Sequence, residues 1–195
     1  MLGQTGSAAQ ERMVELLYSL APGEGYTQSL LEDVRFMRSN RPLRLTPVLY
    51  EPSIVIVCQG RKKGYLGSDV YVYDAMHYLV LSVPLPFISE TEASADDPLL
   101  AVSIRLNMAT VAELVTMVGH GEARSYDSPQ CMFSTPLKMT TANATVRLLE
   151  ALRSPEEAQV LAPSIVREIC YRVLVDEQGG AVRTALAHQG QFGRI

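Results

Sequence analysis

The apolar positions at the start of the chain repeat with the period of an α-helix. The spacing i, i+3, i+4 and i+7 holds for Met13, Leu16, Leu17 and Leu20. Ser7 and Gln10 before them have the spacing of a capping box. The stretch 22–25, Pro-Gly-Glu-Gly, then ends the pattern, because proline and glycine both interrupt helices. Residues 1–25 are therefore predicted to form a helix and a turn, with one apolar stripe packed on the rest of the domain.

From residue 26 to residue 135 the pattern changes to short segments of β type, rich in valine, isoleucine and tyrosine. The predicted strands are 34–38, 54–59, 64–66, 70–73, 78–83, 87–90 and 99–106. Residues 60–63 are predicted to be a turn that joins 54–59 and 64–66 in a hairpin, and 67–69 a second turn. Many short strands with helices at the flanks favour a sandwich or barrel over a parallel sheet. A closed barrel would remove exposed edges and leave room for one small ligand.

Helical spacing returns after the β segments. It predicts a helix over 111–118 ended by Gly119, another over 146–152, and a third that starts near Pro163 and ends before Gly179. The short link 153–163 predicts that the last two form an antiparallel hairpin. The predicted fold class is thus α+β: a β-barrel (26–135) between an N-terminal helix and a C-terminal helical segment (136–195).

Composition and charge narrow the function classes. Of 195 residues, 47% are hydrophobic and 19% charged, which suits a packed domain, and the net charge is -4. The densest basic run is 61–63, so the chain alone is not expected to bind nucleic acid. The longest apolar run, 54–58, is too short to span a bilayer, and the start shows no secretory signal. Three cysteines without a CxxC pair are typical of free thiols in the cytoplasm, which is the expected location.

Residue patterns for catalysis and for metal binding are missing from the sequence. His77, His120 and His188 form neither an HxH nor an HxxxH motif, so no metal is expected. The acidic residues of 90–97 share their stretch with serine, alanine and proline, which is typical of a solvated loop. No GxSxG elbow, Walker motif or GxGxxG fingerprint occurs. We expect neither an enzyme nor a bound cofactor.

The tyrosines are the best indication of a binding site. There are nine tyrosines and no tryptophan, and most of the tyrosines lie in the β region. A tyrosine that points into a barrel offers an apolar ring and a hydroxyl to an organic ligand. Tyr71 and Tyr73 share one face of a strand, so both line the interior or both point outward. The residues predicted to bind a ligand are Tyr71, Tyr73, His77 and Arg105, with Phe36 as an apolar wall.

Two motifs, Tyr-Glu-Pro-Ser at 50–53 and Gln-Gly-Arg-Lys at 59–62, resemble the signature of the N-terminal domain in one subfamily of AraC-type transcriptional regulators. The likeness continues through 71–73, 78–80, 82–86, 93–94, 98–100 and 161–172. It implies a cupin-like β-barrel, a double-stranded β-helix, that senses a small effector and is followed by helices that mediate dimerisation. It also implies that DNA is read by a separate C-terminal module with helix-turn-helix units. This chain is expected to lack that module and to be the sensor half.

The predicted function is therefore effector binding and homodimerisation, with the effector controlling the DNA-binding module. The wide apolar face of the last two helices is the predicted dimer contact: Val146, Leu149, Leu152, Ile165, Ile169 and Val173. The same face could instead pack on its own domain, as amphipathic helices do by default. One alternative is a small cupin enzyme, such as a metal-dependent isomerase or dioxygenase, although such an enzyme needs a histidine-rich interior. Another is a stand-alone binding module.

Overall fold

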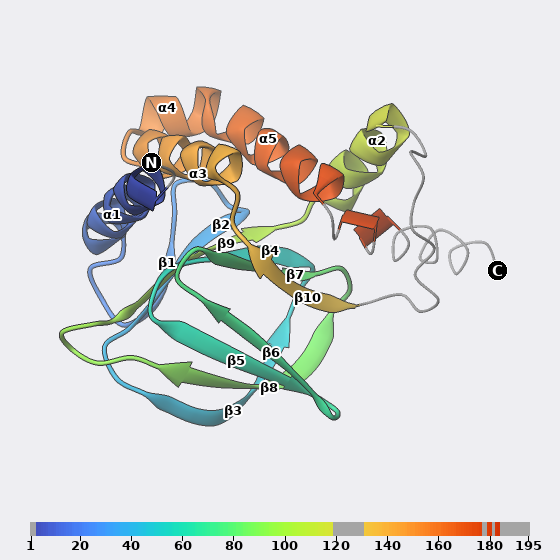
Figure 1. Ribbon diagram of the computed structural model, residues 1–195. Helices are drawn as coiled ribbons and strands as arrows, with labels where there is room; N and C mark the ends of the chain where they lie inside the picture. The colour runs from blue at the N-terminus through green and yellow to red at the C-terminus, as the bar shows by residue number, and fades with distance from the viewer. Residues whose placement is uncertain (1–2, 119–130, 177–178, 181, 184–195) are drawn as a thin grey trace.

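A computed structural model describes residues 3–118, 131–176, 179–180 and 182–183. It has three layers: helices on one side, a six-stranded sheet in the middle and a four-stranded sheet on the other side (Figure 1). The helices are α1 (Gly3–Leu20), α2 (Met108–Val118), α3 (Met139–Ala151), α4 (Pro155–Val160) and α5 (Ala162–Val175). None of these helices is long and apolar enough to cross a membrane.

Every paired strand in the two sheets is antiparallel to its neighbour. The six-stranded sheet contains, in spatial order, β1 (Gly25–Gln28), β2 (Val34–Ser39), β9 (Leu99–Arg105), β4 (Ser53–Gln59), β7 (His77–Leu81) and β10 (Met132–Pro136). The four-stranded sheet contains β3 (Leu43–Tyr50), β8 (Leu85–Glu92), β5 (Arg61–Leu66) and β6 (Asp69–Asp74). The α+β class with antiparallel sheets is thus confirmed. No ladder joins the two sheets within the described ranges, so the predicted closed barrel is not observed there.

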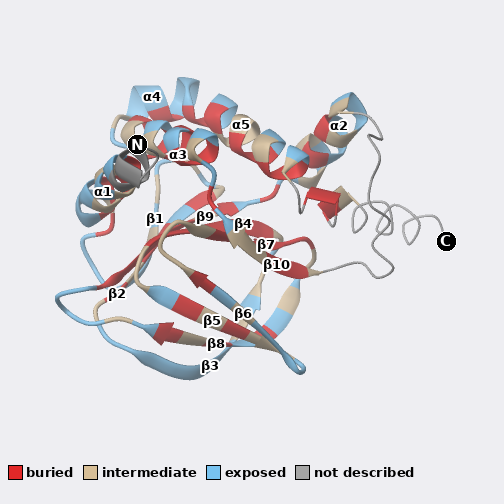
Figure 2. Ribbon diagram, in the orientation of Figure 1, coloured by how far each residue is buried: buried red, intermediate tan, exposed pale blue. Residues whose placement is uncertain are grey.

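Apart from its exposed edge strand β1, the six-stranded sheet is largely buried on both of its faces (Figure 2). In β4, Ile54 and Ile56 point to the helices, whereas Val55 and Val57 point to the four-stranded sheet. A strand with two buried faces carries an uninterrupted apolar run, which is the pattern of 54–58. We call the cluster under the helices the helix-side core; Met13, Leu17, Ile56, Leu148 and Ile169 belong to it. The cluster between the sheets, with Val57, Tyr73, Leu79, Phe87 and Leu99, is the inter-sheet core.

The predicted helices are present, and the last two pack as expected. Lys138 at the start of α3 pairs with Asp176 after α5, with Nζ and Oδ1 2.5 Å apart. Farther along, Arg147 pairs with Glu168 at 2.7 Å, so α3 and α5 run antiparallel. The link between them was not predicted to be helical, yet it forms α4, capped by the hydroxyl of Ser154, which accepts a hydrogen bond from the amide of Glu157. Gly119, the predicted end of α2, lies outside the described residues.

The predicted hairpin between 54–59 and 64–66 is wrong. Residues 61–63 do not turn but begin β5, which pairs with β6 and β8 and not with β4. The change of direction occurs at Gly60 alone, whose φ is +79°. Glycine reaches this left-handed region without strain, and a Cβ there would lie 2.9 Å from the Cα of Leu99. At this one residue the chain leaves the six-stranded sheet and enters the four-stranded sheet. As a result, Lys62 lies inside the molecule.

Candidate ligand-binding site

A cavity of about 630 Å³ opens between the two sheets at one end of the molecule. This volume is in the range of pockets that hold small organic ligands. Its walls come from the β1–β2 loop and strands β1, β2, β3, β4 and β9, which are brought together by the packing of one sheet on the other. The lining residues are Tyr26, Gln28, Glu32, Asp33, Arg35, Met37, Val48, Leu49, Tyr50, Glu51, Ser53, Ser103 and Arg105.

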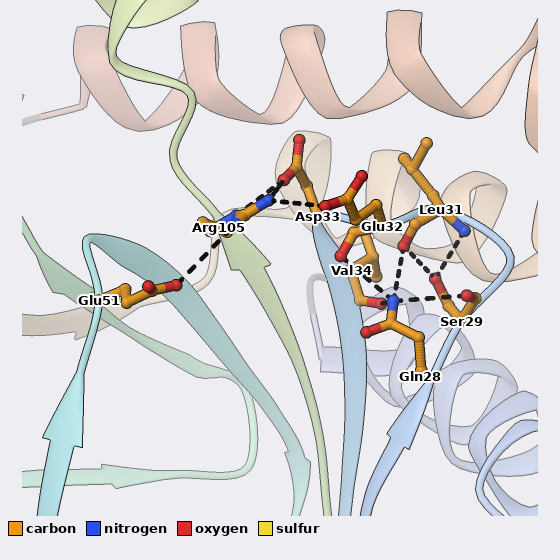
Figure 3. Close-up of polar contacts among 8 residues, drawn as sticks. All are labelled: Gln28, Ser29, Leu31, Glu32, Asp33, Val34, Glu51 and Arg105. Carbon is orange, nitrogen blue, oxygen red and sulfur yellow. Dashed lines mark hydrogen bonds and ion pairs between the residues drawn. The ribbon is translucent and has the colours of Figure 1, made fainter.

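One side of the cavity mouth is held by ion pairs around Arg105 (Figure 3). Its Nε and Nη2 donate to Oδ1 of Asp33 at 2.8 and 2.6 Å. Glu32 and Glu51 carboxylates lie 3.6 and 3.9 Å from the same guanidinium. Asp33 and Glu51 raise the pKa of Arg105, the hydrogen bond to Asp33 being the largest cause. Three carboxylates around one arginine leave this rim with more negative than positive charge.

The Gln28 side chain fixes the loop that carries Glu32 and Asp33 (Figure 3). Its amide donates to the carbonyl oxygens of Leu31 and Val34 at 3.0 Å each. The hydroxyl of Ser29 accepts a hydrogen bond from the amide of Leu31 at 3.0 Å. The loop between β1 and β2 is thereby tied to its own backbone.

On the other side of the cavity lies Arg35, a cation without an ion-pair partner among the described residues. The guanidinium of Arg35 lies 5.3 Å from the centre of the Tyr26 ring, in a cation–π contact. No carboxylate in the described ranges forms an ion pair with it. The Tyr26 hydroxyl donates to that of Tyr50 at 3.4 Å, and the Tyr50 ring meets Phe87 edge to face at 5.1 Å. Burial, followed by the effect of Tyr73, raises the pKa of Tyr50 well above its usual value.

Beyond the cavity, polar side chains continue along the inner face of the four-stranded sheet. Tyr73, Lys62 and Thr91 occupy one row across β6, β5 and β8 in the strand register. Lys62 is only 6% exposed, and its Nζ donates to Thr91 Oγ1 at 3.2 Å. Burial lowers the pKa of Lys62 to about 8. The hydroxyl of Tyr73 is buried with no hydrogen-bond partner among the described residues, although Ser89 lies close enough to act on its pKa.

Of the five predicted ligand residues, only Arg105 lines the cavity. Tyr71 and Tyr73 both face the inter-sheet core. Of the two orientations that the sequence left open for this pair, the inward one is therefore observed. His77 is half-exposed, with Nδ1 2.7 Å from Oδ1 of Asp74. Phe36 is buried in the helix-side core, on the opposite face of β2, and so does not line the cavity. Among the residues that the structure describes, no three His, Cys, Asp or Glu side chains could hold a metal ion together.

The residues predicted for dimerisation belong to the helix-side core. Five of them are at most 9% exposed: Leu149, Leu152, Ile165, Ile169 and Val173. Val146 is half-buried and packs against the same cluster. These side chains hold α3 and α5 on the six-stranded sheet, so they are not exposed for contact with a second chain.

Sequence reasoning missed Arg35, Tyr50 and Lys62 as site residues. Arg35 lies in a strand that was predicted correctly, and its alternation with the buried Val34 and Phe36 indicates that it faces away from the helices. Tyr50 was noted as a tyrosine of the β region and as part of the Tyr-Glu-Pro-Ser motif, but it was not among the predicted ligand residues. Lys62 was assigned to a basic turn, and no pattern within 60–63 distinguishes it from its exposed neighbours.

A model of the family described as the AraC-type transcriptional regulator N-terminus matches residues 30–181. No curated protein sequence matches the chain closely. Among solved structures, the chain is similar to apo ToxT from Vibrio cholerae strain SCE256, a variant, with a TM-score of 0.51 and 11% identity over 82% of this chain and 59% of that one. It also matches unsaturated-fatty-acid-bound wild-type ToxT from the same strain, with a TM-score of 0.48 and 12% identity over 82% and 58%. The first of these matches shows a shared fold, and this chain spans 59% of that protein's length.

Proposed function

This chain belongs to the family of AraC-type transcriptional regulator N-termini, and we propose that it is the part of a transcription regulator that binds a small-molecule effector. The observation that carries the proposal is the cavity of about 630 Å³ between the sheets, which is lined by aliphatic, aromatic, polar and charged side chains. The two sheets would act as a cupin-like container. DNA contact would belong to a separate helix-turn-helix module, and bound effector would shift the balance between arrangements of the two parts.

The chemistry of the cavity supports an organic ligand with both apolar and polar parts. Met37 and Val48 offer apolar surface, and Tyr50 adds an aromatic ring fixed by Phe87. Arg35 provides a cation that no described carboxylate neutralises, and it is the group in the cavity best suited to orient a polar ligand. Arg105 keeps its predicted place in the site, but as a rim residue held by Asp33. Tyr71 and Tyr73 stay in the proposal as residues of the interior behind the cavity, and His77 stays in it as a half-exposed residue beside Asp74.

The test is a thermal-shift screen of small metabolites on the wild-type chain and on Ser103→Phe. A ligand that binds only the folded state raises the melting temperature. Ser103 lines the cavity, so a phenyl ring there should fill it and abolish every shift that depends on it. Ser68→Phe, the same substitution in the exposed turn between β5 and β6, is the control and should keep the shifts. Shifts that survive in Ser103→Phe would contradict the proposed site.

We also propose that the regulator is a homodimer, through outward side chains of the helical layer rather than the buried face. The candidates lie on α4, on α5 and between them, where Val160, Leu161, Tyr171 and Val175 are each between 44% and 66% exposed. Sedimentation at micromolar concentration should show a dimer for the wild type and a monomer for Tyr171→Glu with Val175→Glu. A wild-type chain that stays monomeric would contradict this part of the proposal.

A further inference from the structure

The charged side chains of the cavity are separated by sign along strand β2. Every second residue of a strand points to the same face, and Asp33, Arg35 and Met37 all line the cavity. Asp33 lies at the mouth, in the loop before β2, whereas Met37 is 5% exposed and belongs to the inter-sheet core. Arg35 therefore lies between the mouth and the interior, one step farther in than the carboxylates.

The mouth carries two carboxylates that form no hydrogen bond with Arg105 (Figure 3). The Arg105 guanidinium donates instead to Asp33, at 2.6 and 2.8 Å. The carboxylates of Glu32 and Glu51 lie 3.6 and 3.9 Å from the same group, which is farther than an ordinary hydrogen bond. Their side chains are 92% and 61% exposed. Both carboxylates are therefore accessible to a second cation that arrives at the mouth.

Arg35 is the cation that lies farther in. Its guanidinium stacks on Tyr26, 5.3 Å from the ring centre, and forms no ion pair with a carboxylate of the described ranges. In the strand register Arg35 stands between Gln28 of β1 and Ser103 of β9, which also line the cavity. A guanidinium has five N–H donors in one plane and can bind a carboxylate through two parallel hydrogen bonds. The hydroxyl of Ser103 can add a further hydrogen bond to the same anion.

This distribution of charge selects against ligands that carry a single charge. A plain anion would be repelled at the mouth, where three carboxylates surround one arginine. A plain cation would be attracted to the mouth but would place no negative charge against Arg35. A neutral ligand would displace water from Arg35 without replacing the solvation of its charge. A ligand with one charge of each sign complements both parts of the cavity.

We propose that the effector is a zwitterion whose carboxylate pairs with Arg35 and whose ammonium group pairs with Glu32 and Glu51. This inference rests on the proposed function and names the class of ligand. Successive positions on one face of a strand are about 7 Å apart, so a short carbon chain separates the two charges of the ligand. Met37 and Val48 offer apolar surface to the carbon part of the ligand.

The test is isothermal titration calorimetry of the whole 195-residue chain at pH 7 with 5-aminopentanoate, pentanoate, pentylamine and pentan-1-ol. These five-carbon compounds differ in which end is charged. We expect the Kd of 5-aminopentanoate to be about tenfold below that of pentylamine, which lacks the contact with Arg35. It should be about threefold below that of pentanoate, which lacks the contact with the more exposed carboxylates. Pentanoate that binds as tightly as 5-aminopentanoate would overturn the proposal, and so would 5-aminopentanoate that does not bind.

Two variants assign the two charges of the ligand to residues. Arg35→Gln should weaken 5-aminopentanoate and pentanoate by about tenfold and leave pentylamine no weaker. Glu32→Gln combined with Glu51→Gln should weaken 5-aminopentanoate and pentylamine by about threefold, but not pentanoate. The matched controls are Arg153→Gln, between α3 and α4, and Glu156→Gln on α4, both at exposed positions. They should change no Kd. Unchanged binding in Arg35→Gln, or an equal loss in the controls, would overturn the proposal.

Failure of this ligand class is distinguishable from failure of the effector cavity. Ser103→Phe should fill the cavity for every ligand, whatever its charge. If other metabolites bind the wild type but not Ser103→Phe, while 5-aminopentanoate does not bind at all, the zwitterion is wrong and the cavity stands. If no compound distinguishes Ser103→Phe from the wild type, the cavity is not the binding site and the zwitterion proposal fails with it.

Discussion

The two faces of the six-stranded sheet pack against different kinds of interior. The helix-side core is the larger cluster, built almost wholly from apolar side chains of the sheet and of all five helices. The inter-sheet core is smaller and adjoins a cavity; among the described residues, its Lys62 has no carboxylate partner and the Tyr73 hydroxyl accepts or donates no hydrogen bond. Apolar burial stabilises a fold, whereas unsatisfied buried polar groups destabilise it and are typical of functional sites. The comparison supports the proposed division of roles, in which the helix side stabilises the domain and the inter-sheet side binds the ligand.

The largest expected effect comes from two adjacent leucines on opposite faces of β9. Leu100 is fully buried in the helix-side core, and Leu99 is 2% exposed in the inter-sheet core. We expect Leu100→Ala to lower the free energy of unfolding by about 4 kcal/mol and Leu99→Ala by about 2–3 kcal/mol, because the larger cluster can collapse less around the missing atoms. Urea unfolding measures both. A larger loss at Leu99 would contradict the division of roles between the two faces.

A smaller loss is expected from one hydrogen bond that ties the sheet to the end of α5. The hydroxyl of Tyr78 donates to Oδ2 of Asp176 at 2.8 Å, and the Asp176 side chain is only 7% exposed. Tyr78→Phe should lower the free energy of unfolding by about 2 kcal/mol, since a bond to a buried charge is removed. The matched control is Tyr65→Phe, whose hydroxyl donates to Glu90 at 2.7 Å on the outer face, where the loss should be about 0.5 kcal/mol. Equal losses of unfolding free energy in the two variants would show that burial does not determine how much these hydrogen bonds stabilise the fold.

On the inter-sheet side we expect a gain in stability from Lys62→Met, by about 1 kcal/mol at pH 7, because an unpaired buried charge is replaced by an apolar side chain. Burial lowers the pKa of Lys62 in the folded chain to about 8, against 10.5 when unfolded. The folded state thus binds fewer protons than the unfolded state. The destabilisation caused by the Lys62 charge has its full size below pH 8 and decreases as the pH rises towards 10.5. Wild type and variant should therefore converge between pH 8 and 10.5 in thermal unfolding. A stability difference between wild type and Lys62→Met that does not change with pH would contradict the claim that Lys62 carries an uncompensated charge.

The smallest expected effect is that of Tyr73→Phe. Its hydroxyl has no described hydrogen-bond partner, so its removal should change the free energy of unfolding by less than about 0.5 kcal/mol or raise it slightly. Chemical unfolding beside Tyr78→Phe makes the comparison, since both hydroxyls are buried and only one is bonded. A loss as large as that of Tyr78→Phe would mean that the Tyr73 hydroxyl is satisfied.

Regular periodicity was enough to predict much of this fold. The strand β2 and the helices α3 and α5 follow apolar repeats of their own period, and β9 carries the uninterrupted apolar run of a strand buried on both faces. The family expected from the Tyr-Glu-Pro-Ser and Gln-Gly-Arg-Lys motifs is confirmed by the match over 30–181. Predictions failed where the pattern was not decisive. The strand β3 was not predicted, because a proline such as Pro47 argues against a strand. Since β3 is an edge strand, it tolerates this proline.

The site was harder to predict because it depends on how the two sheets pack. Gly60 redirects the chain within one residue, and a glycine before a basic run also fits a turn. The burial of Lys62 follows from that redirection and from strand alternation inside β5. Arg35 and Tyr50 meet at one cavity although they are on different sheets, and no local spacing encodes that contact. Phe36 was assigned to the ligand side because the sequence shows which residues share a face, but not which face meets which layer.

The effector cavity is tested most directly by methyl NMR of the methionines. Met37 lines the cavity, and Met13 is fully buried in the helix-side core. For any metabolite that raises the melting temperature, we predict a saturable change in the chemical shift of the Met37 methyl group and little change at Met13. A ligand that moves Met13 and leaves Met37 unchanged would contradict binding between the sheets.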